Sequence, residues 1–208
     1  MMKTRIFNLL ILDESGSMYC IEKQAVDSVN ETLQSVRAAQ KKYDDQEHYV
    51  SFVTFNGERV KTILDCVEAE KAKDITPDQF NPNCSTPLYD AIGKSVTELK
   101  KNVSENDKVL VTIITDGYEN SSTEYNQASV KAMTEKLGKM GWTFAYIGAN
   151  QDAMAVSRGL GISNALDFQA TEEGTMEMSR TLRKSRDRWF DRIADNAVGA
   201  TEDFFKED

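Results

Sequence analysis

The sequence is poor in the residues that carry much of enzyme and metal chemistry. Its 208 residues include one histidine, three cysteines and three prolines. The cysteines (Cys20, Cys66 and Cys84) are odd in number and have no CxxC spacing, a pattern that indicates neither a disulfide framework nor a zinc site. We therefore expect a reduced protein of the cytoplasm.

Long hydrophobic runs are also missing from the sequence. No stretch approaches the roughly 20 apolar residues that a membrane-spanning helix needs. The apolar segment 1–12 contains Asn8 and continues directly into Asp13 without a small-residue cleavage site, which is unlike a secretory signal peptide. We expect neither a membrane span nor a cleaved leader.

The sequence has no surplus of basic residues. A net charge of −9 argues against general binding to nucleic acid or to an anionic membrane, because both need a basic face. One basic cluster near the end of the chain is interrupted by Asp187 and Asp191, and we expect it to be a solvated helix face. Its members are Arg180, Arg183, Lys184, Arg186 and Arg188.

Hydrophobic patterning predicts strands that alternate with helices. Near-continuous apolar runs at 5–12 and 108–115 are typical of strands buried on both faces. Further strands are predicted at 49–55, 59–66, 143–147 and 165–168, and helices at 17–41, 88–103, 121–140, 151–158 and 171–197. Asn56-Gly57 favours a type I′ turn, which makes 59–66 an antiparallel edge strand. We predict an α/β fold with a mainly parallel sheet, as one domain over residues 1–198 with a frayed tail at 199–208.

The two buried strands both end in an aspartate. The first runs into Asp13, with Ser15 and Ser17 just beyond, and the second runs into Asp116. Right-handed crossovers bring such strand ends to one edge of the sheet, and Thr86, before its own helix, approaches from the same side. Carboxylates and hydroxyls are hard oxygen donors, so we predict a site for Mg²⁺, or for Mn²⁺ or Ca²⁺, made by Asp13, Ser15, Ser17, Thr86 and Asp116. For each turn taken alone, an ordinary helix cap is the alternative.

These segments resemble the metal-ion-dependent adhesion site of von Willebrand factor type A (vWA) domains. The resemblance rests on Asp13-x-Ser15-Gly16-Ser17, on Thr86–Ile92 and on Thr115-Asp116-Gly117, which follow in the family's order. Residues 148–152 through 167–168 also resemble small bacterial members. The resemblance implies a doubly wound, three-layer α/β/α, Rossmann-like fold with six strands in the order 3-2-1-4-5-6 and one antiparallel edge strand.

The resemblance also implies how the site works. Ser15 and Ser17 would bind the cation directly and Thr86 directly or through water, whereas Asp13 and Asp116 would act largely through water or orient the hydroxyls. Neutral donors leave one coordination position open for an acidic residue of a partner protein. We expect Glu14 to point away from the site and to have no role.

A hydrolytic enzyme is the main alternative. The only histidine, His48, begins a strand that enters the sheet from the opposite edge, where we expect an exposed polar residue, so a Ser-His-Asp triad lacks its base. No P-loop or GxGxxG motif is present. A Mg²⁺-dependent hydrolase or phosphatase that uses Asp13 as a nucleophile stays open, although such enzymes usually carry a second acid where this chain has Ser15.

The sequence thus favours a metal-dependent protein-binding module over an enzyme. We expect a bacterial or phage-encoded scaffold or adaptor, in a stress-response assembly of the tellurite-resistance kind or beside a chaperone-type ATPase. Cys84 is interpreted as a small loop residue rather than a reactive thiolate. Surface turn residues at the edge of the site are predicted at Tyr118, Glu119, Asn120 and Asn150.

Overall fold

A six-stranded sheet forms the centre of the molecule. The computed structural model describes residues 3–197 and 203–206. The strands are β1 (Thr4–Asp13), β2 (Gln46–Asn56), β3 (Arg59–Glu68), β4 (Lys108–Thr115), β5 (Trp142–Ala149) and β6 (Asn164–Phe168). Their order is β3-β2-β1-β4-β5-β6, and all neighbours are parallel except the antiparallel pair β2–β3. The predicted fold class and strand order are confirmed.

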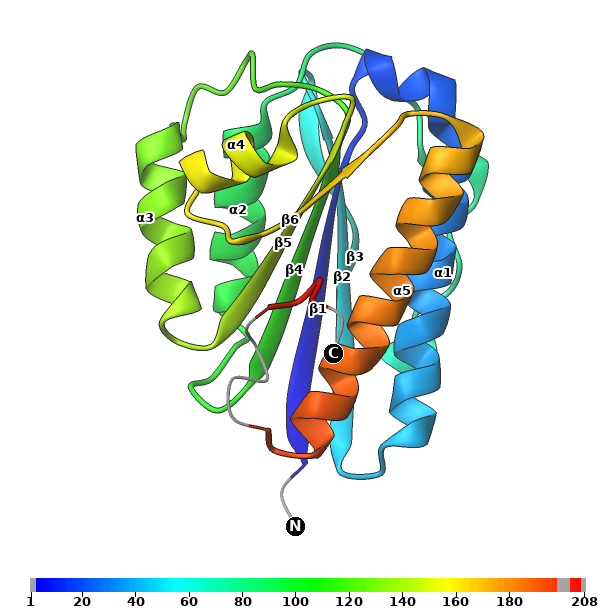
Figure 1. Ribbon diagram of the computed structural model, residues 1–208, viewed down its shortest axis with the longest axis vertical. Helices are drawn as coiled ribbons and strands as arrows, with labels where there is room; N and C mark the ends of the chain where they lie inside the picture. The colour runs from blue at the N-terminus through cyan, green and yellow to red at the C-terminus, as the bar shows by residue number, and fades with distance from the viewer. Residues whose placement is uncertain (1–2, 198–202, 207–208) are drawn as a thin grey trace.

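Helices cover both faces of this sheet, in three layers (Figure 1). One face carries α1 (Glu22–Lys42) and α5 (Glu172–Ala194), and the other carries α2 (Leu88–Lys100), α3 (Gln127–Gly138) and α4 (Ala153–Gly159). Successive β1 residues belong to different layers: Leu10 packs with the α1–α5 cluster and Ile11 with the α2–α3 cluster. The strand is therefore buried on both faces, which explains its near-continuous hydrophobic run.

The register of the central strands places the two aspartates side by side. Leu12 of β1 pairs with Ile114 of β4, so both strands end at the same edge of the sheet, at the top in Figure 1. A 3₁₀ helix, Gly16–Ile21, follows β1 before α1 begins, whereas the sequence predicted one helix from Ser17. The short turn is needed because the chain must leave the sheet edge before it can run back along the face.

The β2–β3 hairpin is present, but its turn is not the predicted one. Asn56 pairs with Arg59, so Gly57 and Glu58 form the two-residue loop, and neither has a positive φ. The Asn56 side chain instead accepts hydrogen bonds from the backbone N–H groups of Glu58 (3.0 Å) and Arg59 (3.2 Å). Asparagine therefore stabilises this turn through its side chain and not through a left-handed backbone.

The segment 121–126 was predicted as the start of a helix, but α3 begins only at Gln127. The N–H groups of Ser121 and Ser122 donate to the Glu119 carboxylate. Those of residues 123, 124 and 125 donate to the Asp90 carboxylate. Two acids thus satisfy the backbone donors that a helix would otherwise use.

Two predicted surface residues are buried. His48 was expected to be exposed, yet it lies inside β2 at 1% exposure, and its ring meets that of Phe190 edge-on at 4.8 Å. Arg186 was placed on a solvated helix face, yet it is 2% exposed. The helical period explains the error, because Arg186 shares the buried side of α5 with Leu182, Phe190 and Ile193.

The end of the chain is described only in part. Residues 199–202 and 207–208 of the predicted frayed tail (199–208) lie outside the described residues, as do residues 1–2 and 198 of the predicted domain. Within the described part, Phe204 is fully buried in the α1–α5 cluster, and its N–H donates to Asn164 Oδ1 at 2.9 Å. Fraying is therefore wrong for this residue. Along the described ranges, the structure contains no helix that is long and apolar enough to cross a membrane.

Candidate metal centre

The turn after β1 is fixed by the fully buried Asp13. Asp13 Oδ1 accepts a hydrogen bond from the backbone N–H of Ser15 at 2.7 Å. Asp13 Oδ2 accepts one from the hydroxyl of Thr115 at 2.5 Å. Both carboxylate oxygens are therefore engaged, and together they connect the β1 turn to the end of β4.

Two hydroxyls and a second carboxylate lie directly above this turn. Ser15 Oγ and Ser17 Oγ are 3.3 Å apart, and the Ser17 hydroxyl donates to Asp116 Oδ1 at 2.6 Å. Ser15 is buried, Asp116 is half-buried and Ser17 is exposed. The oxygens thus run from the interior to the surface.

Gly117 brings Thr86 into the same group. A Cβ on Gly117 would lie 2.9 Å from Thr86 Oγ1 and 3.7 Å from Asp13 Oδ2, so the missing side chain lets both oxygens approach the β4 turn. The backbone of Thr86 is held by Asn120, whose Oδ1 accepts from Thr86 N (2.8 Å) and whose N–H donates to Thr86 O (3.1 Å). All five predicted site residues are thereby brought together at one edge of the sheet.

Glu14 was expected to point away from the site and to have no role, but its side chain holds the loop before Thr86. It is fully buried, its Oε1 accepts from Asn81 N at 2.7 Å, and its backbone oxygen accepts from Asn83 N at 3.0 Å. The N–H of Gly16 adds a bond to Cys84 O at 3.1 Å. The prediction that Glu14 has no role is wrong, because it helps to position the Thr86 loop.

The two aspartates sit in an environment that disfavours their negative charge. Burial raises the pKa of Asp13 to about 6, although hydrogen bonds from Thr115 and Ser15 oppose this. Burial also raises the pKa of Asp116, against the hydrogen bond from Ser17. Across the described residues, no basic side chain contributes to either shift. The local charge is therefore left uncompensated by the protein.

The donor set fits a hard divalent cation. Every candidate ligand atom is an oxygen, and three of the five groups are neutral hydroxyls, a set that suits Mg²⁺ or Mn²⁺ and not a soft metal. In the described ranges, no three His, Cys, Asp or Glu side chains gather as a metal cluster. A cation here would depend on hydroxyls as much as on carboxylates.

Sequence reasoning missed several residues that hold the centre in place: Thr115, Asn120, Gly117 and Glu14. Asn120 was interpreted as a surface turn residue, but it is one of the contacts that fix Thr86. Thr115 was quoted only as part of a motif, although its position beside Asp116 at a strand end was a usable signal. Gly117 was likewise quoted only as part of that motif. Glu14 carries no signal in the sequence, since its burial follows from loop packing.

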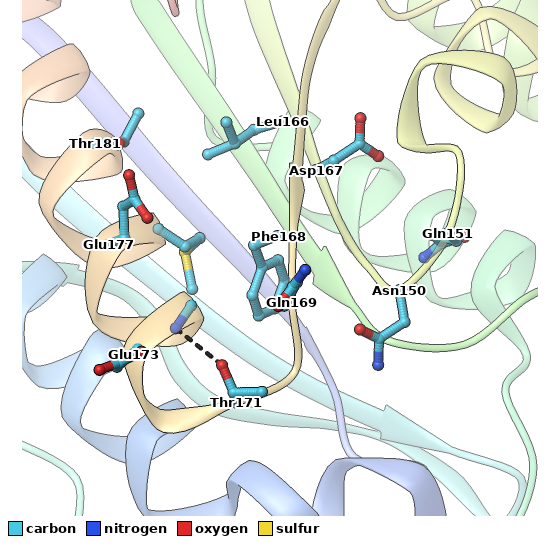
Figure 2. Close-up of a pocket in the computed structure, with 12 residues that line it drawn as sticks. Asn150, Gln151, Leu166, Asp167, Phe168, Gln169, Thr171, Glu173, Glu177 and Thr181 are labelled. Atoms are coloured by element: carbon cyan, nitrogen blue, oxygen red, sulfur yellow. Dashed lines mark hydrogen bonds between the residues drawn. The ribbon is translucent and has the colours of Figure 1, made fainter.

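A separate pocket of about 630 Å³ opens at the same edge, between β6 and α5. Figure 2 shows Asp167 on one side of it and Glu173 and Glu177 on the other. None of the five candidate ligands lines it, but Gln151 does, and Gln151 Nε2 lies 3.5 Å from the backbone oxygen of Thr115. The pocket is thus adjacent to the centre and not part of it.

Solved structures show the same fold at low sequence identity. The chain is similar to proximal thread matrix protein 1 from the mussel byssus (TM-score 0.61, 14% identity), covering 88% of this chain and 46% of that one. It is also similar to the D319A mutant of the PilB minor pilin from Streptococcus sanguinis (TM-score 0.65, 12% identity), covering 94% of this chain and 64% of that one. A third similar structure is the vWF domain of the type V pili tip protein Mfa5 from Porphyromonas gingivalis (TM-score 0.59, 9% identity). The match covers 94% of this chain and 96% of that one.

The chain therefore spans about half to two thirds of the first two proteins and nearly all of the third. The comparison with curated protein sequences gives no match. The model of the von Willebrand factor type A domain matches residues 9–178, a range that includes all five candidate ligands and most of the chain. On this match, the protein belongs to the von Willebrand factor type A domain family.

Proposed function

We propose that this domain binds a divalent cation, Mg²⁺ or Mn²⁺, and uses it to bind a partner protein through an acidic residue. The observation that carries the proposal is the convergence of oxygens from three separate loops around Gly117. Ser15, Ser17 and Thr86 would hold the cation, while Asp13 and Asp116 support the hydroxyls and the local charge.

A cation held mainly by hydroxyls keeps most of its positive charge and attracts a further carboxylate. The oxygen groups around the proposed cation differ in their burial. Asp13 is fully buried with both oxygens engaged, whereas Ser17 is exposed and Asp116 half-buried. The open side of the centre therefore faces solvent, where a partner's Asp or Glu can reach it.

The proposal contains no catalytic step. A nucleophilic Asp13 would have to present a free oxygen, but its two oxygens accept hydrogen bonds from Ser15 N and from the Thr115 hydroxyl. His48 lies at the other end of the sheet with its ring against Phe190. Turnover of a generic phosphate ester with Mg²⁺, abolished in Asp13→Ala, would favour the hydrolase alternative instead.

We further propose that the domain acts as a scaffold or adaptor in a bacterial assembly within the cytoplasm. The three cysteines are free, which supports a reducing compartment. A stress-response assembly and a chaperone-type ATPase are the two settings we propose to test first. The pilus and byssus proteins share the fold at 12–14% identity, and their settings are not carried over.

Metal binding is tested by isothermal titration calorimetry of Mg²⁺ and Mn²⁺ into the metal-free protein. We expect saturable binding by the wild type and its loss in the double variant Asp13→Ala, Ser15→Ala. Ser163→Ala, an exposed serine at the opposite edge, serves as the matched control.

Affinity capture with Mg²⁺ or with chelator then tests the partner. We expect a protein that is retained only with Mg²⁺ and only by the wild type. Equal retention under all conditions contradicts the proposal.

A further inference from the structure

We propose that the partner segment recognised at this edge is basic on both sides of one acidic residue, and that it extends from the metal centre toward the pocket between β6 and α5. The inference rests on the proposed function, because it describes the ligand of the same metal centre. Three observations support it: the charge of the site loops, the charge of the neighbouring pocket, and two exposed tyrosines.

The loops that carry the centre contain no basic residue. Segments 13–22, 80–89 and 116–126 have no lysine, arginine or histidine. Their acids are Asp13, Glu14, Glu22, Asp116, Glu119 and Glu124. At the nearby hairpin tip, Glu58 and Arg59 offset each other, and Lys23 lines a different groove, between α1 and α5.

This charge pattern restricts the partner. The bound cation would be the local positive charge that attracts the partner's carboxylate, while the surrounding acids repel further negative charge. A segment with several acids would meet repulsion beyond the metal. In a segment with one acid and basic neighbours, the acid is attracted by the cation and the basic residues by the surrounding acids. Charge complementarity therefore favours such a segment.

The pocket beside the centre extends the acidic surface. Its lining includes Asp167, Glu173 and Glu177 and no basic side chain. Asp167 Oδ1 accepts from Ala153 N at 2.7 Å. Glu173 and Glu177, one turn apart on α5, have no partner among the described residues and line the α5 side of the pocket (Figure 2). Because Gln151 connects the pocket to Thr115, a chain bound at the metal can place a lysine or arginine there.

Two aromatic side chains complete the surface. Tyr19 and Tyr118 are 72% and 59% exposed, more than any other large apolar side chain among residues 3–197 and 203–206. Each tyrosine follows a candidate ligand by two positions, Ser17 and Asp116, whose side chains are hydrogen-bonded to each other. Exposed tyrosine faces bind guanidinium and ammonium groups well, so they suit the same basic segment.

The test uses a displayed peptide library in which residues on both sides of a fixed aspartate are randomised. The library is selected on the wild-type protein in Mg²⁺ and eluted with chelator. We expect the eluted peptides to be enriched in arginine and lysine next to the aspartate. We also expect the affinity of a synthetic peptide from this set to fall as salt concentration rises.

Variants then test the surface with that synthetic peptide. Tyr118→Ser is expected to weaken binding roughly 3- to 30-fold, and Glu173→Gln with Glu177→Gln roughly 2- to 5-fold each. Mg²⁺ affinity should not change in either, since neither touches a candidate ligand. Met140→Ser and Glu105→Gln, exposed at the opposite edge, are the matched controls and should bind like the wild type.

The outcomes separate this inference from the proposed function. If no peptide is eluted by chelator, metal-dependent recognition itself fails. If eluted peptides have neutral or acidic residues beside the aspartate, the proposed function survives and the basic-partner inference is overturned. The assignment of the surface is likewise overturned if basic peptides bind the tyrosine and glutamate variants as tightly as the wild type.

Discussion

Two buried aspartates near the same edge of the sheet are satisfied in different ways. Asp90, at the start of α2, accepts hydrogen bonds from three consecutive backbone N–H groups, those of residues 123, 124 and 125, at 2.7–2.9 Å. Burial alone would raise its pKa, but these bonds and the charge of Lys94 hold the pKa below its usual value. For Asp13, burial wins and the pKa rises to about 6.

The difference separates a structural acid from one available to a ligand. Asp90 stabilises a loop and needs nothing more. Asp13 orders the β1 turn, but its charge is not offset by the protein, and the same is true of Asp116 beside it. A divalent cation would supply the missing charge, so the metal-free site stores an electrostatic cost that binding relieves.

The largest expected effect is on stability at Asp90. Asp90→Ala removes the acceptor of three part-buried N–H groups, those of residues 123, 124 and 125, and we expect a loss of roughly 3–5 kcal/mol in the free energy of unfolding. Urea denaturation measures this, with the exposed Glu105→Ala as control. A loss below about 1 kcal/mol would show that Asp90 is not the structural acid of the pair.

His48 extends the comparison from buried acids to a buried base, whose charged form is positive. It is buried, with Nε2 2.9 Å from Gln46 Oε1 and with no partner for Nδ1 in the part of the chain that the structure describes. Burial lowers its pKa to about 4. The folded state therefore binds fewer protons than the unfolded one. Stability from neutral His48 is complete above pH ~6.5 and is lost as pH falls toward 4, by up to about 3 kcal/mol.

Unfolding free energies of the wild type and of His48→Gln, measured across this pH range, check the prediction. The two pH profiles should diverge below pH ~6.5, with the wild type losing stability faster. Parallel profiles would mean that His48 is accessible to protons in the folded protein.

At Asp13 the expected effect is on the metal. Asp13→Asn keeps an acceptor for Ser15 N or Thr115 but removes the negative charge, so Mg²⁺ affinity should fall roughly 10- to 100-fold. The metal-free variant should be at least as stable as the wild type, because a buried unpaired charge is gone. Calorimetry and urea denaturation in chelator measure the two quantities. A variant that is destabilised without metal would place Asp13 with Asp90 as a structural acid.

The smallest expected effect is at Gly117. In Gly117→Ala the new Cβ would lie 2.9 Å from Thr86 Oγ1, so Thr86 has to move away. We expect a roughly 10-fold loss of Mg²⁺ affinity with less than about 1 kcal/mol lost in stability. Gly138→Ala, where nothing lies within 4 Å of the added atom, is the matched control. Unchanged affinity would remove Thr86 from the ligand set.

The sequence predicted the strands and the residues at their ends because both depend on local patterns. A doubly buried strand reads as a continuous apolar run, and Asp13 and Asp116 stand directly after such runs. What could not be predicted depends on contacts between distant loops. The Asp90 carboxylate removes residues 123–125 from helix formation, and Glu14 meets Asn81 across 67 residues.

The burial of single polar residues was also not predicted from the sequence. His48 was assigned by its position at a strand start, and Arg186 by the charge of its neighbours. Phe190 of α5 lies against His48, and Arg186 belongs to the buried side of α5. Neither arrangement can be seen from the local sequence.

The most direct test of the central claim is a crystal structure of the protein grown with Mn²⁺, in which the anomalous scattering of the metal is mapped. We predict a single strong peak at the sheet edge, in contact with the hydroxyl oxygens of Ser15, Ser17 and Thr86. A fully occupied crystal with no peak there, or with its peak bound elsewhere, would contradict the account.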